Sequence, residues 1–247
     1  MAEISRIEWT FASWNPVTGC SRISPGCEHC YAELMTRRLH AMGQEKYRNG
    51  FIVTTHERTL NIPGSWIKPR IIFVNSMGDL FHEEVPVEFI KKTFSVMNRV
   101  DRHTYQILTK RSGRLAELDS ELHWNPHIWA GVSVENPDYL YRIDHLRKSG
   151  AHIKFISFEP LLDEIRDVDL TGIDWVIVGG ESGPHARPVR KDWIIRLRDI
   201  CLDRDIPFFF KQWGGSNRKA SGRMLDGRIW ENMPDPSKQM RLKFSSG

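Results

Sequence analysis

Three of the four cysteines of this 247-residue chain lie in one short stretch, which reads CSRISPGCEHCY. Six residues separate Cys20 from Cys27, and two separate Cys27 from Cys30. A disulfide would leave one of these thiols over, and a closed zinc site would lack one of its four ligands. A [4Fe-4S] cube can take three thiolates and keep its fourth iron free for a substrate or cofactor.

The spacing alone leaves a cluster and a zinc ion open, because Cys-x-x-Cys pairs bind both. Zinc would need a fourth ligand, for which His29, His40 and Cys201 are candidates. Cys201 lies on an apolar helical face, where a small buried thiol is the commoner explanation. We expect a helix to begin near His29, since the amides of a helix N-terminus stabilise thiolate charge.

Short apolar, β-rich runs alternate with segments of helical spacing along the chain, which predicts parallel strands joined by helices. The strand candidates are 70–76, 104–110, 128–134, 153–159, 174–180 and 207–213, with a seventh expected near WNPVTG at 14–19. Three sets of apolar residues share a helical face: Val87, Ile90, Phe94 and Met97; Leu140, Ile143 and Leu146; and Ile194, Leu197 and Cys201.

The strand candidates are apolar throughout, as strands buried on both faces are, so a full or partial (β/α) TIM-type barrel is favoured over a doubly wound sheet. Polar residues recur where these strands end, namely Ser76, Asp79, Lys110, Ser133, Glu135, Glu159, Glu181 and Lys211. Any one of them could be a helix cap or a loop ion pair. In a barrel all strand ends meet at one mouth, so together they predict a site there.

We expect the barrel to occupy residues 1–213 and a C-terminal extension to occupy 214–247, with a hairpin around Asp226-Gly227 and a flexible tail. The apolar runs are far shorter than the roughly 20 residues of a membrane helix, so no membrane partner is expected. The N-terminus lacks a secretory signal, and a reducing cytoplasm is the expected location. A net charge of +4 permits a nucleic-acid partner, and oligomeric state is not determined.

Blocks along most of the chain resemble a phage- and prophage-associated family of three-cysteine-motif proteins. They are IEWTFASWNPVTGCSRISPGCEHCYAE, FVNSMGDLFHEEVP, ILTKRSGRL, WAGVSVEN, FISFEPLL, VIVGGESGPHARPV, FFFKQWGG and LDGRIWENMP, from Ile7 to Pro234. The family is a divergent relative of radical S-adenosylmethionine enzymes, including spore photoproduct lyase-like proteins. The resemblance implies a barrel whose cysteine loop holds a [4Fe-4S] cluster through Cys20, Cys27 and Cys30.

The resemblance also implies roles for the mouth. The residues that would contact S-adenosylmethionine are Ser76, Ser133, Glu135, Gly179, Gly180, Glu181 and Tyr31; those that would orient or act on the substrate are Lys110, Glu159, Lys211 and Asp79. For the Glu-Lys combinations an interior salt bridge is the alternative, and for Gly179-Gly180 it is an ordinary tight turn. The chain departs from the superfamily in its six-residue first cysteine gap and in having NSMGD where Gly-Gly-Glu is frequent.

The implied function is a radical enzyme that makes a 5'-deoxyadenosyl radical, takes electrons from a donor and acts on a nucleic-acid component, as in DNA photoproduct repair or base modification. The alternative is a nucleic-acid-binding or accessory protein stabilised by zinc or iron–sulfur, supported by the basic stretch 218–228. A hydrolase or lyase run by Asp79, His82 and Glu83 would be a third class, but these residues equally serve as a cap and as packing.

Overall fold

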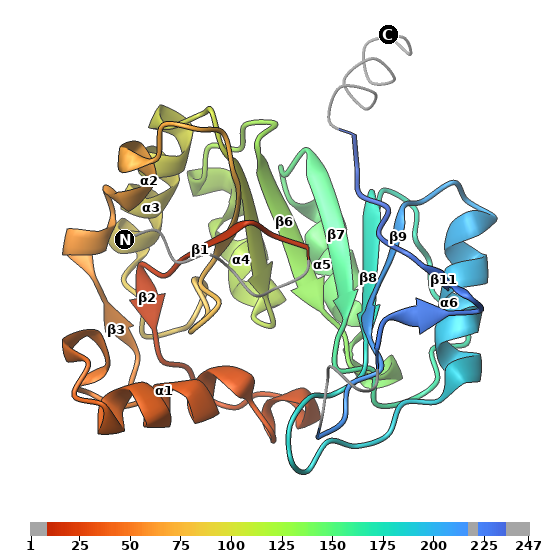
Figure 1. The fold of residues 1–247 in the computed structure, drawn as a ribbon. Coiled ribbons are helices and arrows are strands. Elements are labelled where there is room, and N and C mark those ends of the chain that lie inside the picture. Colours follow the sequence, from red (N-terminus) through yellow and green to blue (C-terminus); the bar gives the residue numbers. More distant parts are fainter. Residues whose placement is uncertain (1–8, 217–221, 236–247) are drawn as a thin grey trace, which may run out of the picture.

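A seven-stranded parallel sheet forms the centre of the computed structural model, which describes residues 9–216 and 222–235 (Figure 1). Its order is β1 (Ala12–Trp14), β4 (Ile71–Val74), β5 (Thr104–Thr109), β6 (Ile128–Ser133), β7 (Ile153–Phe158), β8 (Trp175–Gly179) and β9 (Phe208–Gln212). Strands that follow one another in the main sheet along the chain are also neighbours in space, and all six pairings are parallel. The curled sheet is a partial (β/α) barrel, with β1 and β9 at the ends of its strand order.

Six strand predictions are confirmed to within one or two residues at each end. The seventh strand, β1, lies just ahead of the predicted position and shares only Trp14 with it. Val17–Thr18, inside WNPVTG, forms the short strand β2 instead and pairs antiparallel with β3 (Thr54–Thr55).

Helices follow most strands and cover the outer face of the sheet (Figure 1). The α-helices are α1 (Tyr31–Ala41), α2 (Ile62–Ser65), α3 (Val87–Arg99), α4 (Ser112–Leu118), α5 (Tyr141–Lys148) and α6 (Lys191–Leu202). The 3-10 helices are η1 (Pro25–Cys27), η2 (Glu45–Tyr47), η3 (Glu57–Thr59), η4 (Asp119–Glu121) and η5 (Pro137–Tyr139). The predicted apolar faces of α3, α5 and α6 pack against the core; Val87 and Leu140 are partly buried, Leu140 as the N-cap of α5, and the other residues are buried. Cys201 in α6 is a fully buried thiol, as expected.

Aromatic side chains fill the inner face of the curl. Trp9 lies with its ring centroid 4.7 Å from that of Phe73 in β4 and 6.0 Å from that of Trp175 in β8. The ring centroid of Trp175 in turn lies 6.2 Å from that of Trp129 and 6.0 Å from that of Phe209. Each large buried ring contributes about 1.5–3 kcal/mol, and edge-to-face pairs add about 0.5–1.5 kcal/mol. The inner face therefore has an apolar, aromatic floor below the ends of the strands.

The predicted C-terminal extension contains the predicted hairpin, β10 (Met224–Leu225) and β11 (Arg228–Ile229). Asp226 and Gly227 have φ angles of 51° and 78°, as a two-residue hairpin turn with two left-handed residues requires. The main chain after this hairpin pairs with β9, where the amide of Phe210 donates to the carbonyl of Trp230 at 2.9 Å, so it covers part of that sheet edge. The predicted flexible tail falls largely outside the described residues, as does most of the basic segment 218–223.

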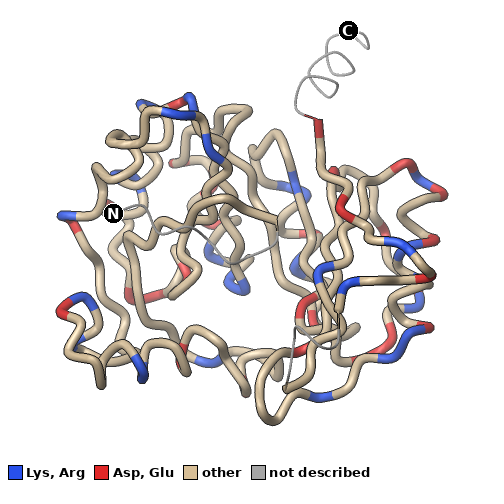
Figure 2. The backbone as a smooth tube through the Cα atoms, viewed as in Figure 1, with Lys and Arg blue, Asp and Glu red and all other residues tan. Residues whose placement is uncertain are grey.

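Charged residues are interspersed along the described chain, with Lys and Arg alternating with Asp and Glu over helices and loops (Figure 2). None of the helices in the described ranges is both long and apolar enough to cross a membrane.

Packing at Gly131 of β6 gives a test of the inner face. A Cβ atom at this position would overlap the ring of Phe155 on the neighbouring strand, so Gly131→Ala should destabilise the protein by about 1–3 kcal/mol through overpacking. The measurement is urea unfolding. Gly113→Ala in α4 is the matched control: its Cβ would meet nothing within 4 Å, and alanine is the better helix former, so stability should hold or rise. Equal stability of Gly131→Ala and wild type would contradict this packing.

Candidate functional site

The cysteine loop lies over the carboxyl ends of β5, β6 and β8, to which side chains fasten it. Its middle is η1, and Cys30 is the N-cap of α1, so the helix begins two residues after the predicted position. Burial raises the pKa of the Cys30 thiol, while the amides of Ala32 and Glu33 in the first turn of α1 act in the opposite direction.

At the end of β5 the loop is held by Arg111. This guanidinium donates to Sγ of Cys20 at 3.3 Å and to Oγ of Ser21 at 2.9 Å. Oγ of Ser21 also pairs with Nε2 of His82 at 2.8 Å. Burial, followed by the negative charge of Asp79, raises the pKa of Cys20 to about 12, and Arg111 counteracts part of that shift.

At the end of β6 the loop is held by Glu135, which is fully buried. Ser24 donates to Oε1 of Glu135 at 2.7 Å, and Gly26 lies so close that a Cβ there would be 2.5 Å from Cγ of Glu135. Nζ of Lys110 pairs with Oε1 of this carboxylate, and Nη1 of Arg142 pairs with Oε2 at 3.0 Å. Burial by itself would raise the pKa of Glu135, but the charges of Lys110 and Arg142 outweigh it and lower the pKa below its usual value.

At the end of β8 the loop is held through Glu181. Nδ1 of His29 pairs with Oε2 of Glu181 at 3.0 Å, and Nε of Arg187 donates to the same oxygen at 2.9 Å. Arg187 also reaches the loop directly, with Glu28 at 3.0 Å and the carbonyl of Pro25 at 2.9 Å. Burial opposes ionisation of Glu181, but the hydrogen bonds from Arg187 and His29 prevail and lower its pKa to about 2.

Glu159 and Lys211 form an ion pair across β8. Nζ of Lys211 lies 2.6 Å from Oε1 of Glu159, and between them is Gly179, where a Cβ would touch both side chains at 3.4–3.5 Å. A Cβ at Gly180 would overlap the carbonyl oxygen of Trp213. Packing within the protein alone explains why glycine occupies both positions. The predicted contact of Gly179 and Gly180 with a nucleoside stays a prediction.

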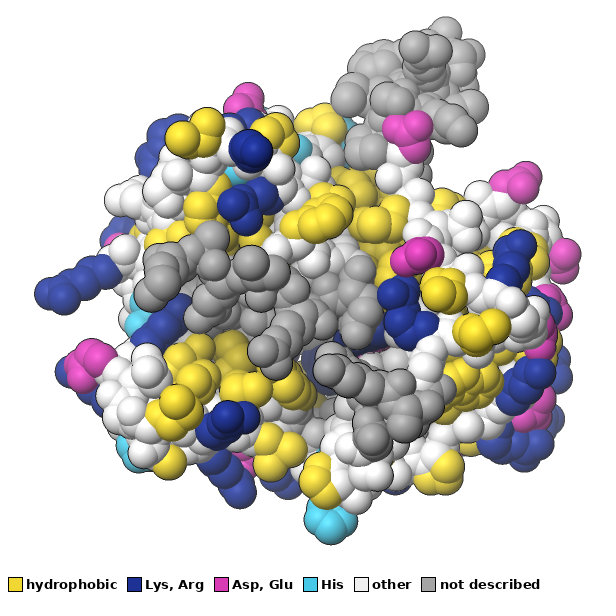
Figure 3. All heavy atoms as spheres, in the orientation of Figure 1, with side chains coloured by type: hydrophobic (Ala, Val, Ile, Leu, Met, Phe, Trp, Pro, Cys, Tyr) yellow, Lys and Arg dark blue, Asp and Glu magenta, His cyan; other side chains and the backbone are white. Residues whose placement is uncertain are grey.

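The remaining predicted cofactor residues lie in different surroundings. Oγ of Ser76 donates to Oδ1 of Asn15 at 3.1 Å, and Ser133 is buried with its carbonyl accepting from Arg142 at 2.8 Å. Tyr31 is 58% exposed on the first turn of α1, where hydrophobic and basic side chains share the surface in Figure 3.

Asp79, His82 and Glu83 do not form a separate acid–base group. Asp79 is buried and accepts hydrogen bonds from Oγ1 of Thr109 at 2.7 Å and from the amides of Phe81 and Lys110 at 3.0 and 3.1 Å. Glu83 pairs with Arg111 at 2.7 Å. These contacts agree with the structural interpretation of the cluster, although Asp79 orders the turn after β4 rather than capping a helix.

The three loop cysteines are free thiols, and the charge of Cys27 raises the pKa of both Cys20 and Cys30. Among residues 9–216 and 222–235, no three His, Cys, Asp or Glu side chains converge on the position of one metal ion. Thiolates are donors that suit both zinc and iron–sulfur clusters, so both groups stay candidates for this loop.

Three arginines of the site were not among the predicted site residues: Arg111 and Arg187 bond to the loop directly, and Arg142 holds Glu135. Arg111 directly follows the predicted Lys110, and Arg187 belongs to a basic run six residues after Glu181, so position near a strand end was the available signal. Arg142 lies inside α5, and nothing in its local sequence distinguishes it from a solvated helix residue.

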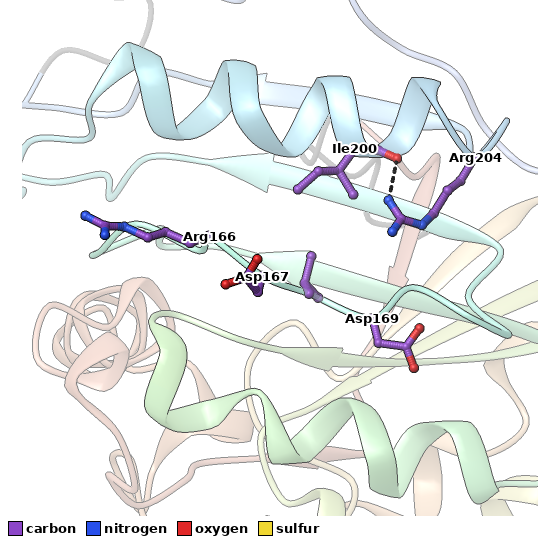
Figure 4. Close-up of a pocket in the computed structure, with 6 residues that line it drawn as sticks. Arg166, Asp167, Asp169, Ile200 and Arg204 are labelled. Carbon is purple, nitrogen blue, oxygen red and sulfur yellow. Dashed lines mark hydrogen bonds between the residues drawn. The ribbon is translucent and has the colours of Figure 1, made fainter.

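A hollow of about 450 Å³ lies elsewhere, between the C-terminal half of α6 and residues 166–169 (Figure 4). Arg166, Asp167, Asp169, Ile200 and Arg204 line it, together with Val168. Arg204 is turned back onto the carbonyl of Ile200 at 3.3 Å. No residue of the cysteine loop lines this hollow, so it is not part of the site.

A model of the family described as "Protein of unknown function (DUF5131)" matches residues 4–234. Two solved structures resemble the fold at low sequence identity. Spore photoproduct lyase complexed with dinucleoside spore photoproduct has a TM-score of 0.48 and 12% identity, covering 72% of this chain and 58% of that one. A double mutant of spore photoproduct lyase with bound AdoMet and dinucleoside spore photoproduct has a TM-score of 0.49 and 10% identity, covering 81% and 63%. The chain therefore spans about three fifths of the length of these structures. No curated protein matches its sequence.

The lowered pKa of Glu181 predicts an acid dependence of stability. The folded-state pKa of about 2 lies below the usual 4.5, so the stabilisation is complete above pH 4.5 and is lost as pH falls towards 2. Between pH 7 and pH 3 wild type should lose on the order of 2 kcal/mol more stability than Glu181→Gln. Urea unfolding at the two pH values measures this difference. Glu88→Gln, at an exposed position in α3, is the control and should keep the wild-type dependence; the same behaviour in Glu181→Gln would refute the assignment.

Proposed function

This chain belongs to the DUF5131 family, and we propose that it is an iron–sulfur enzyme of the radical S-adenosylmethionine type that acts on a nucleic-acid component. The observation that carries the proposal is the fastening of a loop with three free thiols over the polar strand ends of a partial barrel. Three thiols without a fourth in the loop are the donor set of a cluster with one open iron.

Cys20, Cys27 and Cys30 would hold the [4Fe-4S] cluster, which with S-adenosylmethionine would supply the one-electron chemistry that generates a 5'-deoxyadenosyl radical. The chain's own part is to position the reactants and to limit access of water. The aromatic floor formed by Trp9, Trp129 and Trp175 closes the inner face below the site, and all three side chains are buried.

The carboxylates at the mouth suit recognition of amino and hydroxyl groups. Glu135 and Glu181 both have lowered pKa values, so at neutral pH they are ionised and accept hydrogen bonds without giving up a proton. Their arginine partners fix them in place. We assign Glu135 and Ser133 to the polar groups of S-adenosylmethionine, and Lys110, Glu159 and Lys211, whose side chains retain partial exposure, to the orientation of the substrate. Asp79 is buried, and its part is to hold the main chain of Lys110 and the guanidinium of Arg111 in place.

The substrate class comes from the family resemblance seen in the sequence. A base or a DNA photoproduct offers carbon-bound hydrogen for a radical to abstract, and an electron donor must supply the reducing equivalent. A metal-stabilised nucleic-acid-binding or accessory protein, with zinc or an iron–sulfur cluster, is the other candidate.

Reconstitution with iron and sulfide under anaerobic conditions tests the cofactor. Wild type should take up about four irons per chain and, once reduced, should give an electron paramagnetic resonance signal that changes when S-adenosylmethionine is added. Cys27→Ala should lose both the iron and the signal. Cys201→Ala should keep both the iron and the signal, since this thiol belongs to α6 and is buried in the hydrophobic core. A protein that carries zinc and shows no cluster signal would remove the proposal in favour of the alternative.

The substrate is tested by product formation. Release of 5'-deoxyadenosine by the reduced holoprotein should increase when ultraviolet-irradiated DNA is added, compared with the same DNA before irradiation. Chromatography of the nucleoside products measures both the cofactor fragment and any repaired or altered base. Unchanged release with both DNA samples, and no altered base in either, would exclude a nucleic-acid component as substrate while leaving the cofactor assignment standing.

A further inference from the structure

Arg111 is a buried charge placed between two carboxylates and the first cysteine of the loop. Its side chain is only 3% exposed. A guanidinium taken out of water is costly unless its charge is balanced and its N–H groups find acceptors. The acceptors of its N–H groups therefore indicate the role of the Arg111 side chain.

All five N–H groups of Arg111 have an acceptor. Nε donates to Glu83 at 2.7 Å. Nη1 donates to Sγ of Cys20 at 3.3 Å and to Oδ2 of Asp79 at 3.4 Å. Nη2 donates to the carbonyl and to Oγ of Ser21, at 3.1 and 2.9 Å. The carboxylates of Glu83 and Asp79 thus fix the plane of the guanidinium. Three of its five N–H groups donate to two consecutive loop residues, Cys20 and Ser21.

We propose that Arg111 is the residue that positions Cys20 as a metal ligand, through an N–H···S hydrogen bond from a guanidinium held by Asp79 and Glu83. The inference rests on the proposed function for the identity of the metal group, but its contact with the loop is a property of the chain itself. Loss of a group that hydrogen-bonds to a metal-ligating side chain and orients it typically lowers the metal affinity 10–100-fold. Hydrogen bonds to ligand sulfur also raise the reduction potential of an iron–sulfur centre.

Lysine cannot replace arginine in this role. Its ammonium is a single point with three donors, whereas the planar fork reaches Ser21, Cys20 and both carboxylates at once. Arg111→Lys keeps the buried charge, and Arg111→Met removes it while keeping much of the length. A property that both variants lose depends on the fork rather than on charge.

The first measurement uses the metal-free protein. Amide hydrogen exchange of residues 20–24, followed by mass spectrometry, should speed up by about tenfold or more in Arg111→Lys and Arg111→Met, because the loop loses its fastening at β5. Arg102→Met is the matched control. Arg102 is more exposed than Arg111, and it donates to the carbonyls of Trp66, Pro63 and Gly64, away from the loop, so its loss should leave this segment unchanged.

The second measurement uses the reconstituted holoprotein. Iron affinity in competition with a chelator should fall 10–100-fold in both Arg111 variants, and the midpoint potential of the remaining cluster should become more negative. Wild-type exchange and wild-type iron retention in Arg111→Lys would overturn the proposal. If Arg111→Met does not fold, Arg111→Lys and Ser21→Ala, which removes one acceptor of the fork, carry the test.

The two proposals fail in different ways. If wild type binds no cluster, the proposed function is wrong, and the exchange measurement still decides whether Arg111 fastens the loop. If wild type binds a cluster and the Arg111 variants bind it equally well at an unchanged potential, the proposed function stands and the role of Arg111 is refuted.

Discussion

A charge buried at the end of a strand must be paired, because an unpaired ion inside a protein costs several kcal/mol. Three buried carboxylates and one half-buried carboxylate lie at the mouth of the partial barrel, and each has a cationic partner: Asp79, Glu135 and Glu181 are buried, and Glu159 is half-buried. Three of these pairs also bond to the cysteine loop, at Cys20 and Ser21, at Ser24, and at Pro25, Glu28 and His29. The pairing that makes buried charge tolerable is therefore the pairing that holds the loop.

The inner face of the sheet divides into an apolar and a polar level. Large rings occupy the amino-terminal half of the strands, where Trp129 and Trp175 pack against each other. Small residues follow: Ser133 and Ser157 are paired in register, and Gly179 lies between Glu159 and Lys211. Charged side chains come last. Because strand residues on one face recur every second position, this order from floor to mouth is repeated on β6, β7 and β8.

Much of this arrangement could be anticipated from local patterns. Continuous apolar runs marked six of the seven strands, and a polar residue after each run marked the mouth, since parallel strands end on one side. The ion pair of Glu159 with Lys211 agrees with the salt bridge that remained open as an alternative to a catalytic role. The seventh strand was located only approximately: β1 ends at Trp14, the first residue of WNPVTG, and only the pairing of Val17 with Thr55 shows that the rest of this segment belongs to a different ladder.

The sequence by itself determined the kind of chemistry available, through three clustered thiols, and the class of fold, through the period of its apolar residues. Only the tertiary structure decided which groups act on those thiols. Arg111 and Cys20 are 91 positions apart in the chain, and His29 and Glu181 are 152 apart, so no local pattern joins them. Gly179 and Gly180 show the same limit. The requirement for glycine at these positions depends on which atoms a Cβ would overlap. Those atoms belong to neighbouring strands and loops, which only folding brings together.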